Sequence, residues 1–380
     1  MLSYAEYLKL HHDEIKNVIN LQKQVDNLNS SNFQDFKAMI IKSNIDHDKN
    51  KLIQLLNMIQ IGIAIRPHSY ELYFNLLESI SSHIKSHFSE QELISIFPKR
   101  PSILKLYEKG LISINTIYEQ CRIHKYYINY FAPEMKEFYS DFFEANIDQE
   151  LRGSLNFEDM KKYRKRGQNP APIAEIIRND DIELFQNFIS KTNTKFDSIL
   201  IPSEYEQCRF IMQNMNYADY AAFYGSINIF KYLLLNECTL TYKTAQFAVA
   251  GGNYEIIHLL EEKKVSFRSC LEVCIQFHQN DIFEYLIENH SNKFKMDFKM
   301  FFVSIEMYNT EFFYQNIEEM MKTDLEMMKD SILTLASIHG VLDIVNFICS
   351  IKEINIIENS YLAFLNFLFF VNGAIIDSCN

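Results

Sequence analysis

Two histidines and two cysteines have the spacing of metal ligands on a helix. His83 and His87 are four residues apart, as are Cys270 and Cys274, so each pair would lie on one helix face. No glutamate follows His83 as a zinc-protease motif requires, and no third ligand is evident for either pair. We therefore expect a solvated helix face for the histidines, packing for the cysteines, and no metal site.

A basic run is the sharpest local charge feature. It consists of Lys161, Lys162, Arg164, Lys165 and Arg166. Such a run is typical of nuclear-import signals and of contacts with phosphate or acidic lipid. Because the linker-like GQNPAP follows it, a basic helix at a domain junction beside acidic neighbours is the interpretation we favour. These five residues remain a candidate basic contact.

Motifs of catalysis and cofactor binding are absent from the sequence. It contains no GxxxxGK[ST] phosphate loop, no GxGxxG, no GxSxG and no HExxH. We expect a protein that is not an enzyme, with no catalytic, metal-binding or cofactor-binding residues.

Composition indicates an all-α protein. Among 380 residues, 48% are hydrophobic, whereas glycine and proline number only 9 and 7, too few for a fold built on tight β-turns. The chain is long for one compact core, which favours two domains or an elongated array. Seven scattered cysteines without a CxxC pair fit reduced thiols. With no signal-peptide pattern at residues 1–14, we expect a cytoplasmic location, with a nuclear one as the alternative if residues 161–166 direct import.

The net charge of −12 is carried by the C-terminal half. Residues 1–168 sum to +1 and residues 169–380 to −13. An acidic half repels nucleic-acid phosphates, so we expect no nucleic-acid partner and, if the partner is charged, a basic one.

The C-terminal half repeats itself. GSINIFKYLL at 225–234 and GGNYEIIHLL at 251–260 align when Gly225 is set over Gly252, and four further windows share the register. Each window predicts two short helices joined by a polar turn, and a unit so small must stack on neighbours to bury its apolar face. We call the position aligned with Gly225 and Gly252 the turn residue of each window. The residues three places after it are Glu183, Asn228, Glu255, Asp281, Glu311 and Asp343.

The units resemble ankyrin repeats, in particular the divergent ankyrin-repeat proteins expanded in protozoan parasites. YADYAAFYGSINIFKYLLLN at 217–236 carries the likeness most clearly, and KLIQLLNMIQ (51–60) and KKYRKRGQNPAPIAEIIRNDDIELF (161–185) resemble the group's N-terminal region and junction. The TPLH-type turn entry of the general ankyrin pattern is absent. The resemblance implies protein–protein recognition through finger loops and first helices, without a cofactor. We expect partner contacts in the finger regions 236–243 and 262–268.

The N-terminal part predicts a separate helical domain. Its first residues alternate in steps of four and three, a seam that fits either a coiled-coil dimer or packing within the chain, and we favour the latter. Capping-box spacing at Ser31–Gln34 and Ser89–Glu92 predicts two helix starts. The seam residues are Tyr4, Leu8, His11, Ile15, Val18, Gln22 and Val25.

The most apolar stretch is YLAFLNFLFFVNGAIID at 361–377. It is short for a membrane span and is interrupted by Asn366, Asn372 and Gly373. We favour a degenerate last repeat helix; a membrane anchor and an incomplete end that exposes apolar surface are the alternatives.

Together these patterns predict a helical domain at 1–160, a basic junction at 161–172 and about six ankyrin-like repeats at 173–380, the last degenerate. The expected function is a non-enzymatic protein-interaction scaffold or adaptor. Two alternatives are a membrane-associated adaptor, tethered by the apolar tail or the basic junction, and a chain that self-associates through its N-terminal seam.

Overall fold

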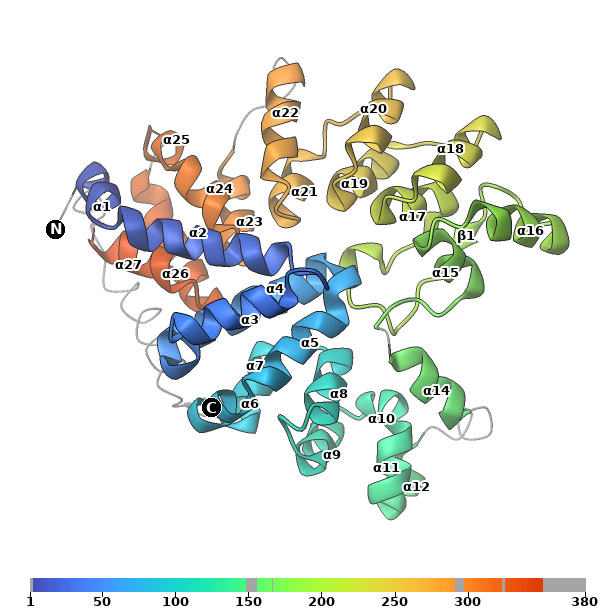
Figure 1. Cartoon of the computed structure of the whole chain (residues 1–380), viewed down its shortest axis with the longest axis horizontal. Helices are drawn as coiled ribbons and strands as arrows, with labels where there is room; N and C mark the ends of the chain where they lie inside the picture. The colour runs from blue at the N-terminus through green and yellow to red at the C-terminus, as the bar shows by residue number, and fades with distance from the viewer. Residues whose placement is uncertain (1–2, 148–155, 166, 291–296, 323–324, 351–380) are drawn as a thin grey trace. The chain divides into compact units, whose positions relative to one another are not determined.

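A computed structural model describes residues 3–147, 156–165, 167–290, 297–322 and 325–350 (Figure 1). These residues are mostly helical and contain almost no strand, which confirms the expected all-α class. Their contacts divide the chain into two units. The repeat domain comprises Met1–Asp26, Ala171–Pro202 and Gln213–Asn380, and the helical domain comprises Asn27–Pro170 and Ser203–Met212. The expected domain of residues 1–160 therefore differs from this division at its N-terminal end.

The helical domain is a set of short helices around a core from α4 and α5. Leu52, Leu55, Leu56 and Ile59 are fully buried, as their helical spacing predicts, whereas Leu72 is only half-buried. Its elements are α3 (Phe33–Lys42), η1 (Ile45–His47), α4 (Lys49–Ile65), η2 (Pro67–Ser69), α5 (Tyr70–Ser79), α6 (Ser81–His87), α7 (Glu90–Ile96), α8 (Arg100–Glu108), α9 (Ile114–Ile123), α10 (Tyr127–Tyr130), α11 (Ala132–Phe138), α12 (Ser140–Asn146), α14 (Phe157–Arg164) and η3 (Arg209–Ile211).

One of the two predicted capping boxes is present. At α7 the Ser89 hydroxyl accepts a hydrogen bond from the Glu92 amide, and the Glu92 carboxylate accepts one from the Ser89 amide. At α3 the prediction of a Ser31–Gln34 box is wrong, because the N-cap is Asn32 and the Ser31 hydroxyl donates to Asn29 instead.

The repeat domain is built from helix pairs that follow one another along the chain (Figure 1). The first helices pack in succession, α15 on α17, then α19, α21, α23 and α26, and the second helices α16, α18 and α20 do likewise. The elements are α1 (Tyr4–Leu10), α2 (His12–Asp26), α15 (Pro172–Arg178), α16 (Ile182–Thr192), β1 (Ile199–Leu200), β2 (Met215–Asn216), α17 (Tyr217–Tyr224), α18 (Ile227–Leu235), α19 (Tyr242–Gly251), α20 (Tyr254–Glu262), α21 (Leu271–Gln276), α22 (Asn280–His290), α23 (Phe298–Glu306), α24 (Thr310–Gln315), α25 (Ile317–Lys322), α26 (Leu325–His339) and α27 (Leu342–Ser350). The two short strands pair antiparallel, Ile199 with Asn216 and Leu200 with Met215.

The turn between the two helices has one backbone conformation in every pair. Its first residue is left-handed throughout, with φ between 51° and 72°. Glycine tolerates this conformation, whereas side-chain-bearing residues pay a steric cost there. Only half of the copies use glycine, so the turn is preserved where its sequence signature is lost. The six residues are Asp180, Gly225, Gly252, His278, Tyr308 and Gly340.

Side-chain burial follows the same register. The small residue four places before the turn residue is fully buried in each of five units, where it lets adjacent first helices approach. The apolar pair that opens the second helix is buried in every unit except the first, where Leu184 is 51% exposed. The five small residues are Ala221, Ala248, Cys274, Ser304 and Ala336.

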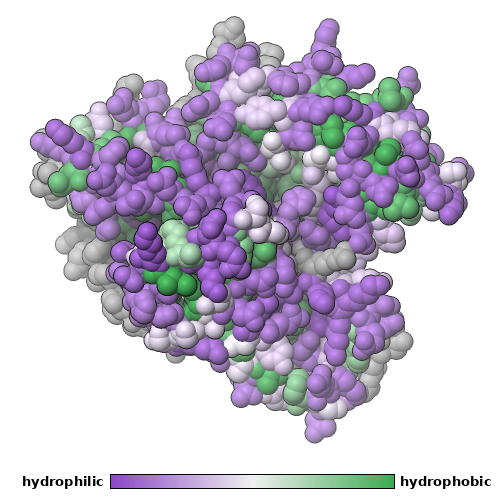
Figure 2. All heavy atoms as spheres, viewed as in Figure 1, coloured by the Kyte–Doolittle hydropathy of each residue, from purple (hydrophilic) through white to green (hydrophobic). Residues whose placement is uncertain are grey.

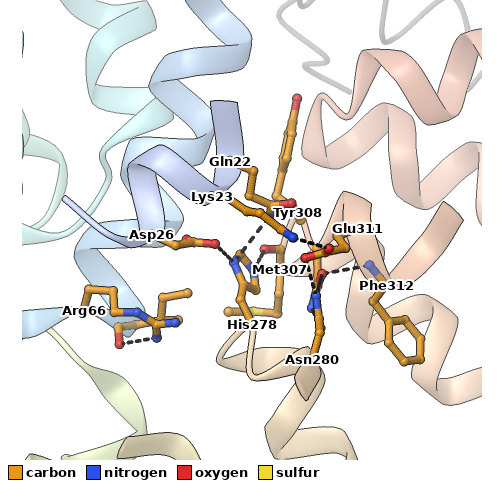
Figure 3. Close-up of polar contacts among 12 residues, drawn as sticks. Gln22, Lys23, Asp26, Arg66, His278, Asn280, Met307, Tyr308, Glu311 and Phe312 are labelled. Carbon is orange, nitrogen blue, oxygen red and sulfur yellow. Dashed lines mark hydrogen bonds and ion pairs between the residues drawn. The ribbon is translucent and has the colours of Figure 1, made fainter. Parts of the chain in front are cut away.

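Helix α2 belongs to the repeat domain because it packs on α24 (Figure 3). The Gln22 side chain donates to the Tyr308 carbonyl oxygen, and Lys23 Nζ lies 2.5 Å from Glu311 Oε1. His278 Nδ1 is 2.8 Å from Asp26 Oδ2, and its Nε2 is 2.8 Å from the Met307 carbonyl oxygen. All these partners of α2 lie in the turns and second helices of the fourth and fifth pairs.

The residues of the predicted N-terminal seam do not form one continuous helix, but they pack within the chain. The helix breaks at His11, which caps α1, so a single continuous helix of three heptads does not form. Gln22 and Val25 are buried, and the other seam residues are half-buried within the chain. This agrees with packing inside the chain, the interpretation we favoured over a coiled-coil dimer.

Candidate functional site

A ladder of hydrogen bonds joins the inter-helix turns of neighbouring pairs. In the second to fifth pairs, the residue after the turn residue donates from its side chain to a carbonyl at or just after the end of the preceding first helix. Ser226 reaches Ile177 at 2.5 Å, Asn253 reaches Gly225 at 3.5 Å, Gln279 reaches Ala250 at 3.3 Å and Asn309 reaches Ile275 at 3.0 Å. The last carbonyls of a helix lack partners within the helix, and each rung gives one such carbonyl a side-chain donor. The Ile177 and Ile275 carbonyls also accept from the amides of Asp180 and His278 in the turn. The turns are thereby fixed relative to one another.

A second ladder joins the opposite ends of the first helices. It uses the position six residues before the turn residue: Asp219 accepts from Thr244 (2.7 Å), Gln246 donates to the Ser269 carbonyl (3.0 Å), and Glu272 pairs with Lys299 (2.6 Å). The type of polar contact differs between the three pairs, whereas its position in the first helix is the same. Because both ends of the first helices are tied, the loops between pairs start from fixed points.

The first finger region, 236–243, begins from such a fixed frame. The Thr239 amide donates to Asp197 (2.6 Å), the Asn216 side chain donates to the Thr239 carbonyl (3.0 Å), and Cys238 is buried as an anchor. Most of the other side chains of the region are exposed, and Tyr242 is 54% exposed. This loop presents an aromatic side chain from a fixed backbone.

The second finger region, 262–268, has the same design. Phe267 is buried and anchors the loop, while Glu262, Lys263, Lys264 and Arg268 are exposed. With one acidic and three basic side chains, this loop is locally basic although the repeat domain is acidic.

An acidic residue recurs at the start of the second helices. Five of the six equivalent positions three residues after the turn residue are acidic and lie in a first helical turn. The N-terminal end of a helix carries partial positive charge, so a carboxylate there stabilises it by about 0.3–1 kcal/mol. These five carboxylates therefore have a role in helix formation, whereas most of the acidic residues of the repeat domain lie elsewhere. The five are Glu183, Glu255, Asp281, Glu311 and Asp343.

The basic run is divided between surface and interior. Lys161, Lys162 and Lys165 are exposed, and Arg166 lies outside the described residues. Arg164 is only 2% exposed, donates two hydrogen bonds of 2.8 and 2.9 Å to the Glu134 carboxylate, and donates a third to the Tyr130 carbonyl. Arg164 is therefore not available as a surface contact, because its guanidinium is buried and pairs with Glu134 inside the helical domain.

The cysteines of the described residues are free and mostly buried. Burial raises the pKa of the Cys121, Cys208, Cys238 and Cys270 thiols to about 12 and that of Cys274 well above its ordinary range. Such thiols stay protonated near neutral pH and are poor nucleophiles and metal ligands. Cys274 occupies the buried small-residue position, as its place in the repeat predicts.

His83 and His87 are not brought together with a common partner. His83 lies instead beside Asp46 and His47, two residues that the sequence pattern did not single out. No periodicity links η1 with α6, so only the tertiary fold reveals this cluster.

Exposed apolar side chains near the first finger region were also missed. Leu235 and Ile201 are each 80% exposed, and Ile199 is 59% exposed. Figure 2 shows hydrophobic surface among hydrophilic residues in the part of the view occupied by β1 and α18. Leu235 follows the helical apolar period, so its sequence context gave no signal of exposure.

The C-terminal stretch 361–380 lies outside the described residues, so its three interpretations stay open. Within the part of the chain that the structure describes, no helix combines the length and the apolar character needed to cross a membrane.

One family of known sequences matches part of the chain. A family described as a domain of unknown function (DUF3447) matches residues 235–318, which include both finger regions and the helices α19 to α24. Neither the curated proteins nor the solved structures contain a match to this chain. The match therefore marks the central repeats as a recurring sequence unit and assigns them no activity.

Proposed function

We propose that the repeat domain is an ankyrin-like solenoid that acts as a non-enzymatic protein-interaction scaffold or adaptor. The observation that carries the proposal is the pair of finger regions, whose side chains are exposed on backbones anchored by Cys238 and Phe267. The six equivalent turns and the two ladders support a solenoid, because each element contacts its neighbours in order.

Rigid presentation explains how such a surface would bind. A loop that is already ordered loses little conformational entropy on association, so more of the contact energy appears as affinity. Exposed aromatic and apolar side chains supply the strongest contacts of protein interfaces, and Tyr242 and the adjacent Leu235 are exposed at the first finger. Arg268 at the second finger is suited to an acidic group on the partner.

The partner we propose is another protein, with no cofactor and no nucleic acid. The overall charge of −13 over residues 169–380 would favour approach of a basic protein. The basic second finger would then contact a local acidic or polar group. The chemically inert, buried thiols and the absence of catalytic sequence motifs support a role without catalysis.

Proximity labelling in the native cell tests this proposal. The wild-type chain is compared with a Leu235→Ser, Tyr242→Ser, Arg268→Ser variant and with Ile123→Ser, a control that alters a 66% exposed residue of the helical domain. We expect a set of proteins labelled by wild type and control and lost with the finger variant. An unchanged set would refute binding through the fingers. Labelling of membrane proteins by all three chains would favour the membrane-associated adaptor.

A further inference from the structure

Asp46, His47 and His83 form a cluster with the donor set of a metal site. Each offers one ligand atom, and these atoms lie within 4.8 Å of one another. His83 Nε2 is 3.4 Å from Asp46 Oδ2, and the two imidazole rings are 4.3 Å apart between centroids. Around a tetrahedral Zn²⁺ with bonds of about 2.0–2.2 Å, neighbouring ligand atoms are roughly 3.3–3.5 Å apart. The His83–Asp46 distance already has this value.

Two elements position the three residues. Asp46 and His47 lie in η1, which follows the left-handed Asn44 (φ 53°) and packs against α3, α4 and α6. His83 comes from α6, one turn before His87 on the same helix. The cluster therefore depends on the packing of η1 on α6 within the helical domain.

The Asp46 carboxylate is buried without enough partners. The residue is only 2% exposed, and its Oδ1 is buried with no hydrogen-bond partner in the described structure. A buried carboxylate needs a compensating cation, and leaving one uncompensated is costly. One divalent ion bound to all three side chains would supply this compensating charge.

We propose that Asp46, His47 and His83 bind a divalent transition-metal ion of the Zn²⁺ type. Two imidazole nitrogens and one carboxylate oxygen suit Zn²⁺ and its neighbours, whereas Mg²⁺ and Ca²⁺ prefer ligand sets made of oxygen alone. Three protein ligands leave a fourth position open. His47 is exposed and His83 is half-exposed, so that position is accessible to water or to a side chain of another protein.

Zn²⁺ titration of the full, reduced and metal-stripped chain against a chromophoric chelator tests the site. His47→Gln and His83→Gln each remove one ligand, and His87→Gln on the same helix is the matched control. Loss of an outer-shell partner typically costs metal sites 10–100-fold in affinity, so loss of a ligand should cost at least about tenfold. We expect one Zn²⁺ per chain, bound equally by wild type and His87→Gln, and at least tenfold weaker binding by the two ligand variants. Helical circular dichroism confirms that each variant is folded.

Three results of the metal-binding measurements would overturn the proposal. They are no Zn²⁺ binding, binding that His47→Gln and His83→Gln leave unchanged, and a Co²⁺-loaded chain with the near-ultraviolet charge-transfer absorption of a thiolate ligand. Asp46→Asn gives a separate readout. If the carboxylate serves a metal, this variant melts no lower than wild type in excess chelator and loses the Zn²⁺-dependent rise in melting temperature. A lower melting temperature in chelator would assign Asp46 to a simple pair with His83.

Discussion

At the scale of single residues, the doublet Gly251–Gly252 shows two different reasons for a glycine. Gly252 has φ of 72°, so its role is the left-handed turn. Gly251 ends α19, and a side chain there would meet backbone carbonyl oxygens of α17, with Ala222 O only 2.7 Å from the added carbon. The first glycine permits helix approach, and the second permits the turn.

Alanine substitutions separate these two roles. Gly225→Ala adds backbone strain at φ of 69° and meets only the Asn253 side-chain amide, so we expect a loss of about 1–2 kcal/mol in unfolding free energy. Gly251→Ala forces α17 and α19 apart, and we expect a loss of about 3 kcal/mol, at the upper end of overpacking costs. Urea denaturation followed by circular dichroism measures both. Equal losses, or a smaller loss at Gly251, would contradict this assignment.

The ladder carboxylate Asp219 should make stability depend on pH. Burial raises its pKa above the ordinary value of 3.8, although hydrogen bonds from Thr244 and Asn216 and the charge of Lys243 act in the opposite direction. The folded state therefore holds this proton more tightly than the unfolded state. Its contribution to stability is fully present below pH 3.8 and is lost as pH rises through the folded pKa.

Asp219→Asn, which cannot titrate, reveals this contribution. The unfolding free energy of wild type minus that of the variant should decrease from acidic to neutral pH. Urea titrations of both proteins at matched pH values give this difference. A difference that stays constant, or that grows toward neutral pH, would show that Asp219 is not destabilised by burial.

At the scale of elements, α2 is attached where the repeat has lost its turn glycine. His278 and Tyr308 occupy glycine positions of the fourth and fifth pairs, and each contacts Gln22 of α2, His278 through its ring and Tyr308 through its backbone carbonyl. The two nitrogens of the His278 ring also lie within hydrogen-bond distance of the Asp26 carboxylate and the Met307 carbonyl oxygen. The strained turn at His278 therefore coincides with an attachment point for the N-terminal helix.

His278→Gly should release α2 while preserving the turn. Glycine relieves the left-handed backbone at 278 but removes both ring hydrogen bonds. We expect amide exchange of residues 12–26 to rise about tenfold, which corresponds to about 1.4 kcal/mol of lost attachment, while α17 to α20 are unaffected. Lys264→Gly is the control, because it relieves a similar φ of 58° at an exposed residue. Unchanged exchange in α2 would argue against the attachment.

Helix periods and repeat register could be read from the sequence, whereas the contacts between distant segments could not. The aligned windows predicted the buried small residues and apolar pairs because local spacing determines which helix face is apolar. Attachment of α2 joins residues more than 250 positions apart and depends on polar groups, which carry no periodic signal. For the same reason the Asp46–His47–His83 cluster and the buried pair of Arg164 with Glu134 were not foreseen.

At the scale of the whole molecule, the basic run no longer acts as one feature. We expect Lys161→Gln, Lys162→Gln, Lys165→Gln to leave the melting temperature unchanged, because these side chains are exposed. We expect the cellular distribution to stay unchanged as well, because the burial of Arg164 interrupts the exposed basic run. Arg164→Gln leaves the Glu134 carboxylate buried and unpaired, which should cost about 3–5 kcal/mol. Thermal melts and fluorescence microscopy of the tagged chain test both. Redistribution of the folded triple variant would restore the import or lipid-contact interpretation.

The finger regions are the part of the whole molecule that we propose to bind a protein partner. Hydrogen–deuterium exchange of the full chain, alone and with a partner identified by proximity labelling, measures this most directly. We predict new protection in residues 236–243 and 262–268, with little change in the buried first helices, which are already protected. Protection confined to residues 161–165 or to other parts of the helical domain, with both fingers unchanged, would contradict the claim.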